Sequence, residues 1–473
     1  MSLTNRDYAA LVREAREFAF PKVVERQEIV GALPKPAPFN LVHIITGIRR
    51  CGKTFFAFQL INGLLASGVQ RDRVFYFNFA DDRLRPAPPT LLNDVIEEYW
   101  RQVPAARSEG CYLFLDEVQE ADDWQGFCQR VAEREKVTLV ITGSSSKLSA
   151  DEIASGFRGR SLEHPMHALS FREFCAFQGT QTPSVDELRD AGAVSPQMRT
   201  ALESAYDQFL IIGGFPGVQR MEPEGRIALL QEYMRDVVAR DVVERYGRVG
   251  IAQASQVALF CLRNTGCELS VNRLVEALRE VGCKTSWETV NETVCLFCQA
   301  HLLSLLPEYS TSLSPDSTAI QKVYAVDAGM TYACSRANQQ DVGKRLETAV
   351  FAELGRRTQG GRAEAVTSFT APTARREKVD FLVGDVLASS PYELIKVTAG
   401  METSKTRRRE LGSLEVAMGR TGMSNGVVIT LREDEEQCWT PDGACESSPH
   451  GSGASRRSPF SRCGTARRAP GAR

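Results

Sequence analysis

The stretch GIRRCGKT at residues 47–54 limits the possible folds of this chain more than any other feature of its sequence. It matches the pattern G-x-x-x-x-G-K-[ST]. The apolar run LVHII precedes it, and FFAFQLINGLL follows it with helical spacing. A phosphate-binding loop requires this order of strand, glycine-rich turn and helix, because backbone N–H groups at a helix N-terminus close around the anion. The sequence therefore predicts a P-loop.

The side chains of this loop predict which ligands it takes. Lys53 is expected to reach the β- and γ-phosphates of ATP, and the Thr54 hydroxyl is expected to bind Mg²⁺. Cys51 stands at a variable position, where the backbone does the binding. ATP and Mg²⁺ are the predicted cofactors. The predicted nucleotide-binding residues are Gly47, Ile48, Arg49, Arg50, Cys51, Gly52, Lys53 and Thr54.

Two acidic residues end a later apolar run, CYLFLDEVQ. Asp116 is expected to contact Mg²⁺ through water, as a Walker B acid does, and Glu117 to polarise the attacking water. One more strand, RVFYFNFADD, lies between this run and the P-loop. The alternation of strands and helices through residue 143 predicts an α/β core, with a parallel sheet covered by helices on both faces. The acid pair favours hydrolysis over transfer to a phosphate acceptor.

Hydroxyl and arginine side chains follow the next predicted strand, KVTLVITGSSSKL. Thr142, Ser144 or Ser145 are candidates to sense the γ-phosphate, and Ser144 is assigned that role; turn formation is the alternative. Arg158 and Arg160 are candidate arginine fingers, acting in the same chain or in a neighbouring subunit. A surface ion pair is the alternative for either arginine.

Composition narrows the class of protein. With 473 residues the chain is long enough for about three domains. A net charge of −2 argues against a strong field for nucleic acid or membrane over the whole protein. The absence of long apolar runs and of a signal peptide predicts a cytoplasmic protein with reduced cysteines. Cys295 and Cys298 form a CxxC pair that is expected to pack in the core, with zinc binding as the alternative.

Eight ordered motifs give the chain a family resemblance between about residues 20 and 440. It resembles a large prokaryotic AAA+-like ATPase family that carries a C-terminal domain of unknown function. The resemblance implies a P-loop ATPase core, a helical region, a winged-helix region and a C-terminal fold similar to restriction endonucleases. The motifs are ITGIRRCGKT, NFADDRL, LFLDEVQ, ITGSSSKL, FRGRS, LSFREF, GGFP and RDVVERY.

The middle of the chain divides into two predicted regions. Arg240, in the helix of residues 232–246, is a candidate lid contact to nucleotide, although a solvated helix face is favoured. Residues 254–326 show three helical runs and then two strands, which fits a winged helix-turn-helix. Its third helix begins near Lys284 but carries Glu288 and Glu292, which would face phosphates unfavourably. DNA binding is one hypothesis for this region, and a structural or protein-docking winged helix is the alternative.

The C-terminal part contains an incomplete set of nuclease residues. Glu347 on a helix and Asp380 on a strand fit two of the acidic positions of an endonuclease-like site. Glu393 and Lys396 are three apart and point to opposite faces of a strand, and alignment on the apolar pattern puts Lys396 and Thr398 at the D/E-x-K positions instead. The sequence predicts a nuclease-like scaffold without cleavage.

These patterns predict five regions and one main activity. The regions are the P-loop core at 1–180, a helical lid region at 181–250, a winged helix at 251–330, a nuclease-like α/β domain at 331–440 and a basic disordered tail at 441–473, which a shifted reading frame would also explain. ATP hydrolysis is expected to move the winged-helix and nuclease-like domains. A nucleotide-gated switch with little turnover and an ATP-fuelled DNA-processing nuclease are the alternatives. The sequence leaves the partner and the oligomeric state open.

Overall fold

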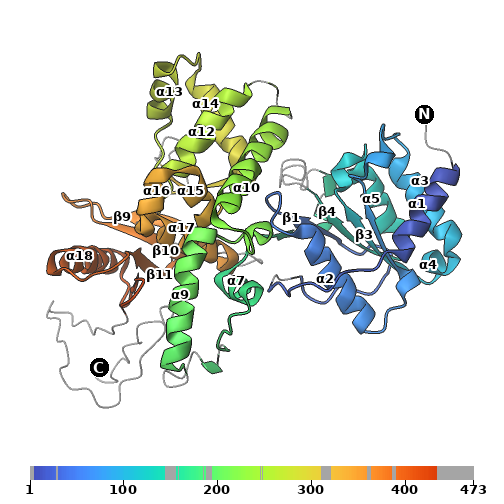
Figure 1. Cartoon of the computed structure of the whole chain (residues 1–473), viewed down its shortest axis with the longest axis horizontal. Coiled ribbons are helices and arrows are strands. Elements are labelled where there is room, and N and C mark those ends of the chain that lie inside the picture. The colour runs from blue at the N-terminus through green and yellow to red at the C-terminus, as the bar shows by residue number, and fades with distance from the viewer. Residues whose placement is uncertain are drawn as a thin grey trace, which may run out of the picture.

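The N-terminal unit is an α/β sandwich (Figure 1). A computed structural model describes residues 5–27, 30–143, 156–157, 159–184, 186–187, 194–244, 247, 249–309, 321–358, 364–385 and 390–433. Five parallel strands form one sheet in the order β2-β3-β4-β1-β5. The elements are α1 (Asn5–Glu17), β1 (Val42–Thr46), α2 (Lys53–Ala66), β2 (Val74–Asn78), α3 (Leu91–Gln102), α4 (Pro104–Ser108), β3 (Cys111–Asp116), α5 (Trp124–Arg134), β4 (Val137–Thr142), β5 (Ser161–Pro165) and α7 (Phe171–Gln178).

Strands β1, β3 and β4 are buried along their whole length, which explains why they read as continuous apolar runs, whereas the edge strand β5 is partly exposed. Alternate side chains of β1 enter different cores: Ile44 packs with α1, α3 and α5, while Ile45 packs with α2. The predicted parallel sheet with helices on both faces is therefore confirmed. Because the P-loop follows β1, it lies at the carboxyl edge of the sheet.

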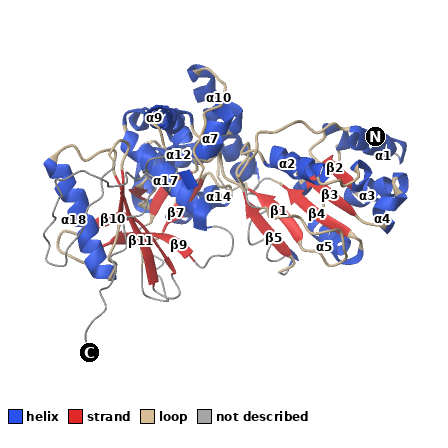
Figure 2. Cartoon of the chain, turned by 90° about the horizontal axis from the view of Figure 1, so that it is seen from below, coloured by secondary structure: helices blue, strands red, loops and turns tan. Residues whose placement is uncertain are grey.

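A mostly helical region follows the core (Figures 1 and 2). Its three strands form an antiparallel sheet in the order β6-β8-β7. Two helices of this region begin with serine N-caps, since Ser270 accepts from the Arg273 N–H and Ser286 accepts from the Thr289 N–H. The elements are α9 (Pro196–Ile212), η5 (Pro216–Val218), α10 (Pro223–Asp236), the π-helix η6 (Val237–Val243), α12 (Ile251–Arg263), β6 (Cys267–Glu268), α13 (Val271–Glu280), α14 (Trp287–Gln299), β7 (Leu303–Leu306) and β8 (Lys322–Ala325).

The C-terminal unit holds a third sheet, in which parallel and antiparallel pairs are mixed, in the order β12-β11-β10-β9 (Figure 2). Helix α17 packs on one face of it and α18 on the other. The winged-helix and endonuclease-like assignments of these two regions stay predictions. The elements are α15 (Ala328–Cys334), α16 (Arg336–Gln340), α17 (Val342–Thr358), β9 (Glu364–Thr370), β10 (Lys378–Asp385), β11 (Ser390–Val397), α18 (Ser404–Thr421) and β12 (Val427–Ile429).

The prediction that both cysteines of the CxxC pair are buried is half wrong. Cys298 packs against the core, but Cys295 is exposed. The buried face of α14 runs through Val290, Val294 and Phe297, and Cys295 lies on the other side of the helix. Within the described ranges, no group of three or more potential ligands is placed to hold a metal ion, and no helix is long and apolar enough to cross a membrane. Residues 441–473, predicted as a tail, lie outside the described residues.

One apolar core joins the P-loop to the helical region. Ile48 and Cys51 of the loop belong to the same buried cluster as Val237 and Val242 of η6 and Phe297 of α14. The α2 face of the parallel sheet is thus continuous with the interior of the helical region. The P-loop therefore packs in the same core as α10, η6 and α14, so a displacement of the loop would disturb that packing.

Candidate functional site

The P-loop has the backbone that its glycines predict. Gly47 and Gly52 adopt φ of 138° and 107°, which favours glycine, and Gly52 is the residue before α2 begins. A Cβ atom on Gly47 would collide with the Met166 carbonyl oxygen. Lys53 is the first residue of α2 and is buried, and its Nζ donates to the carbonyls of Gly47 (2.9 Å) and Ile48 (3.2 Å). The loop therefore wraps around its own lysine at the helix N-terminus.

The predicted metal pair is in direct contact. The Thr54 hydroxyl donates to Asp116 Oδ2 at 2.9 Å, and Asp116 is only 1% exposed. Tyr76 donates to the same oxygen at 2.7 Å, and Thr142 donates to the other carboxylate oxygen. Burial and the charge of Asp116 raise the pKa of Tyr76, so the phenol stays protonated as a donor. A hydroxyl and a carboxylate at this edge are oxygen ligands of the kind that Mg²⁺ prefers, so these residues fit the ion.

The predicted base lies next to this pair. Glu117 follows β3 with φ of 50°, and its Oε2 accepts a hydrogen bond from the side-chain amide of Gln119. The Glu117 N–H points to the Thr142 hydroxyl at 3.4 Å. Thr142, the one of the three hydroxyl candidates that the structure describes, thus contacts both acids. Ser144, the assigned one, lies with Ser145 outside the described residues.

The structure describes one of the two arginine-finger candidates, Arg160. Arg158 lies outside the described residues. Arg160 comes directly before β5, its carbonyl accepts from the Val42 N–H, and its guanidinium pairs with Glu133. Val42 begins β1, whereas the P-loop follows the other end of that strand. Arg160 is therefore at the opposite edge of the sheet, so a role in its own chain is corrected to the surface ion pair, and a role in a neighbouring subunit stays a prediction.

A buried ion pair that the sequence analysis missed supports the P-loop from outside. Arg26 Nε contacts Glu173 Oε1 at 2.7 Å, and the side chains are 5% and 2% exposed. Arg26 Nη1 also donates to the Cys51 carbonyl at 2.9 Å. Glu173 is the third residue of α7 and forms a capping box with Ser170. The spacing S-F-R-E was a signal for that cap, but no sequence signal connects it to Arg26.

Two acids of the helical region contact the P-loop arginines. Asp241 of η6 pairs with Arg49 at 2.8 Å, and Asp236 at the end of α10 pairs with Arg50 at 3.8 Å. Arg240, the candidate lid contact, is exposed, in line with the favoured solvated face. The contact to the P-loop comes from its neighbour, because successive helical residues point about 100° apart.

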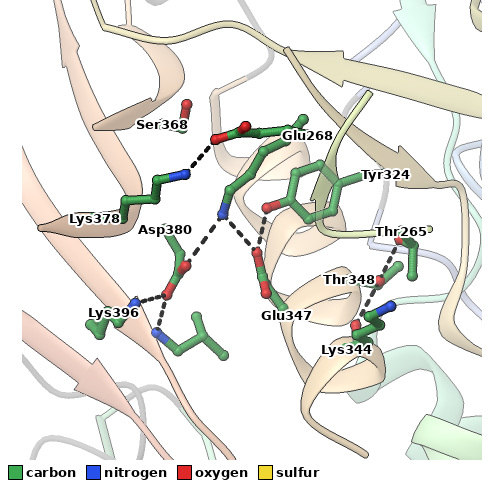
Figure 3. Close-up of polar contacts among 12 residues, drawn as sticks. Thr265, Glu268, Tyr324, Lys344, Glu347, Thr348, Ser368, Lys378, Asp380 and Lys396 are labelled. Atoms are coloured by element: carbon green, nitrogen blue, oxygen red, sulfur yellow. Dashed lines mark hydrogen bonds and ion pairs between the residues drawn. The ribbon is translucent and has the colours of Figure 1, made fainter. Parts of the chain in front are cut away.

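A second polar cluster lies between α17, β8 and the C-terminal sheet (Figure 3). Lys322 of β8 contacts Glu347 at 3.1 Å and Asp380 at 3.3 Å, while Lys396 of β11 contacts Asp380 at 3.2 Å and Glu410 of α18 at 3.4 Å. The pairing of Phe381 with Ile395 puts Lys396 opposite Asp380. This register agrees with the alignment that puts Lys396 at the first position of the D/E-x-K pattern, where a nuclease site has a carboxylate. The cluster borders an open cleft of about 700 Å³.

Lysines neutralise the acids of this cluster. Burial and the charge of Asp380 raise the pKa of Glu347, although Lys322 and the Tyr324 hydroxyl, at 2.6 Å, both donate to it. The ammonium of Lys322 lies between the carboxylates of Glu347 and Asp380, in the position from which a divalent cation would bind both of them. The arrangement suits an internal ionic joint between β8 and the C-terminal sheet.

Lys322→Met is expected to lower the free energy of unfolding by about 2–3 kcal/mol, below the full cost of breaking a buried pair because the groups are partly exposed. The loss should be greater at pH 8 than at pH 5.5. When the pKa of an acid is raised in the folded state, the protein loses stability as the pH rises from the ordinary pKa of the acid to the raised value. Removal of the Lys322 ammonium raises the pKa of Glu347 further, so this loss becomes larger. Urea unfolding at both pH values measures this effect. Lys378→Met, which breaks an exposed pair with Glu268, is the control, and equal losses at both pH values would contradict the expectation.

The comparisons with known proteins agree with this geometry at the level of the domain. Residues 40–175 match the family model of an AAA domain, and residues 203–341 match a model described only as a domain of unknown function. The first match covers the P-loop, both acids and the strands β1 to β5. The chain therefore contains an AAA-like, nucleotide-binding P-loop ATPase domain.

Two relatives match most of the chain, and each is described only as an uncharacterized protein. An uncharacterized protein of Methanocaldococcus jannaschii is 29% identical over 406 residues, which are 85% of this chain and 83% of that protein. An uncharacterized protein of Haemophilus influenzae is 24% identical over 336 residues, 71% of this chain and 79% of that protein.

Similar solved structures are distant. The Walker-type ATPase PABY2304 of Pyrococcus abyssi has a TM-score of 0.38 and 11% identity, with 70% of this chain and 95% of that chain covered. The Aeropyrum pernix ORC1 protein in complex with DNA has a TM-score of 0.28 and 16% identity, with 72% and 93% covered. AMPPCP-bound DnaA from Aquifex aeolicus has a TM-score of 0.23 and 17% identity, with 54% and 80% covered. At such low TM-scores the assignment rests on the domain match alone.

Proposed function

We propose that this protein hydrolyses ATP in a Mg²⁺-dependent reaction at the P-loop. The observation that carries the proposal is the contact between the Thr54 hydroxyl and the buried Asp116 carboxylate, at the N-terminus of a helix that begins with Lys53. Thr54 and Asp116 would hold Mg²⁺, Lys53 would neutralise phosphate charge, and Glu117 would take a proton from the attacking water. The bound ion supplies charge stabilisation at the transferred phosphate.

Glu117→Gln is expected to keep ATP binding and lose turnover, because the amide has the size of the carboxylate but cannot accept the proton of the attacking water. A general base typically contributes about 10²–10⁴-fold to the rate, so phosphate release should fall by about that factor. Phosphate release from Mg-ATP is measured for wild type and variant, each with and without duplex DNA. Equal turnover in both proteins would remove the role assigned to Glu117.

The same experiment separates the alternative functions. Gln119 donates to Glu117, and this hydrogen bond ties up the proposed base, which favours a nucleotide-gated switch with little turnover. Tight binding of ATP with negligible phosphate release in the wild type would support that switch. A rise in turnover with DNA would instead support DNA as a partner of the proposed winged-helix region, residues 251–330.

Movement of the C-terminal regions is part of the proposal. The core shared by the P-loop, η6 and α14 supports a coupling between nucleotide state and the helical region. DNA cleavage by the C-terminal unit has less support, because Lys322 and Lys396 neutralise Glu347 and Asp380.

A further inference from the structure

Arg49 connects the P-loop to a residue 192 positions away in the sequence. Its Nε donates to Asp241 Oδ2 at 2.8 Å, and Asp241 is 1% exposed while the Arg49 side chain is 23% exposed. Asp241 lies in η6, a seven-residue π-helix. Such helices are rare and often occur at functional sites. The pair therefore joins the phosphate-binding loop to an unusual element of the helical region.

Arg49 also lies within the field of Glu117, the proposed base, and of Glu120. Burial lowers the pKa of its guanidinium, but the hydrogen bond and charge of Asp241, with the charges of Glu117 and Glu120, raise it on balance. The guanidinium thus keeps its charge, and it is held by the hydrogen bond to Asp241. A phosphate chain in the loop would bring several negative charges near the same guanidinium.

The surroundings of Asp241 make its partner important. Val237, Val238 and Val242 of η6 are all buried, in the same core as Ile48 and Cys51 of the loop. A carboxylate in such a place is costly without a charged partner. If Arg49 turns toward another anion, this ion pair between the P-loop and η6 is lost.

We propose that ATP and Asp241 compete for the guanidinium of Arg49, so that binding of the polyphosphate releases η6 from the P-loop. This inference rests on the proposed function, because it requires that the P-loop takes ATP. Arg49 is suited to such an exchange, since a guanidinium pairs with either a carboxylate or a phosphate through two N–H groups. The neighbouring pair of Arg50 and Asp236 is longer, at 3.8 Å, and more exposed, so it contributes little.

The test uses the full chain and a slowly hydrolysed ATP analogue with Mg²⁺. Asp241→Asn should bind the analogue about tenfold more tightly than wild type, within the usual range of coupling between sites, because the carboxylate of η6 no longer competes with the phosphates for Arg49. Hydrogen exchange of the amides of residues 237–243 should speed up in wild type when the analogue binds. In Asp241→Asn these amides should exchange fast already, with no further response to the analogue.

Two other variants complete the design. Asp236→Asn is the matched control, and its affinity should stay within about twofold of wild type, since exposed pairs contribute little. Arg49→Gln should bind the analogue more weakly, and its η6 amides should not respond to it. This variant removes the group for which ATP and Asp241 compete, so it tests the exchange independently of Asp241→Asn.

The outcomes separate the two proposals. If wild type binds the analogue and the exchange of residues 237–243 is unchanged, or if Asp241→Asn binds no more tightly than Asp236→Asn, the competition for Arg49 is refuted and the ATP site stands. If wild type does not bind the analogue at all, the proposed function fails and the inference fails with it.

Discussion

Lys53→Ala is expected to abolish ATP binding. Lys53 is buried at the first position of α2, with its ammonium inside the turn of the P-loop, where the phosphates would bind. Two charge-assisted hydrogen bonds to phosphate oxygens are worth about 1.5–3 kcal/mol each, so their loss weakens binding by about a hundredfold or more. Titration calorimetry with Mg-ATP measures the affinity directly.

The matched control is Lys405→Ala, which removes an exposed lysine near the start of α18, in the C-terminal unit. This variant should bind ATP as wild type does. Undiminished binding by Lys53→Ala, in a protein with an unchanged melting temperature, would show that the nucleotide does not use this loop.

Arg26→Ala is expected to lower the free energy of unfolding by about 3–5 kcal/mol, the usual cost of removing one partner from a buried ion pair. Glu173 would remain buried without its cation, and the Cys51 carbonyl would lose its donor. Urea unfolding measures the loss. Arg101→Ala breaks an exposed contact to Glu98 of similar length, 2.6 Å, and should cost less than about 1 kcal/mol. Similar losses in the two variants would contradict the structural role of Arg26.

The same pair predicts a dependence on pH. Burial raises the pKa of Glu173, but the charge and hydrogen bond of Arg26 and the N–H groups of Ser170 and Gln27 outweigh it, so the pKa is lowered. A carboxylate with a lowered folded-state pKa stabilises the fold above its ordinary pKa, and this contribution is lost as the pH falls through the folded-state value. The stability difference between wild type and Arg26→Ala should therefore be full at neutral pH and shrink in acid.

Local patterns were enough to predict the ATPase core and the acids beside it. The turn of Gly47 and Gly52, the strand before it and the helix after it are contiguous in sequence, so their geometry follows from backbone preference and apolar spacing. Asp116 could be placed near Thr54 because parallel strands end at the same edge of a sheet. The same reasoning could not place Arg160, because FRGRS does not show at which edge of the sheet the following strand begins.

Contacts between distant segments could not be predicted in this way. Arg26 meets Glu173 across 147 positions and Arg49 meets Asp241 across 192. Neither pair can be recognised from the periodicity of the sequence, because a charged residue fits the polar pattern of the chain whether its side chain faces water or a buried partner. The sequence offers Arg240 as a candidate contact to nucleotide, with a solvated helix face favoured, whereas in the structure the adjacent Asp241 contacts Arg49 of the P-loop.

The sequence by itself determined the class of domain, the residues that would hold ATP and Mg²⁺, and the order of strands and helices, because these depend on neighbours in the chain. Only the tertiary structure decided which charges are buried together. Docking of η6 on the P-loop and of β8 on the C-terminal sheet removes water from Arg49, Asp241, Lys322 and Glu347. A charge becomes costly without a partner only when it is desolvated, and desolvation is a property of the packed molecule.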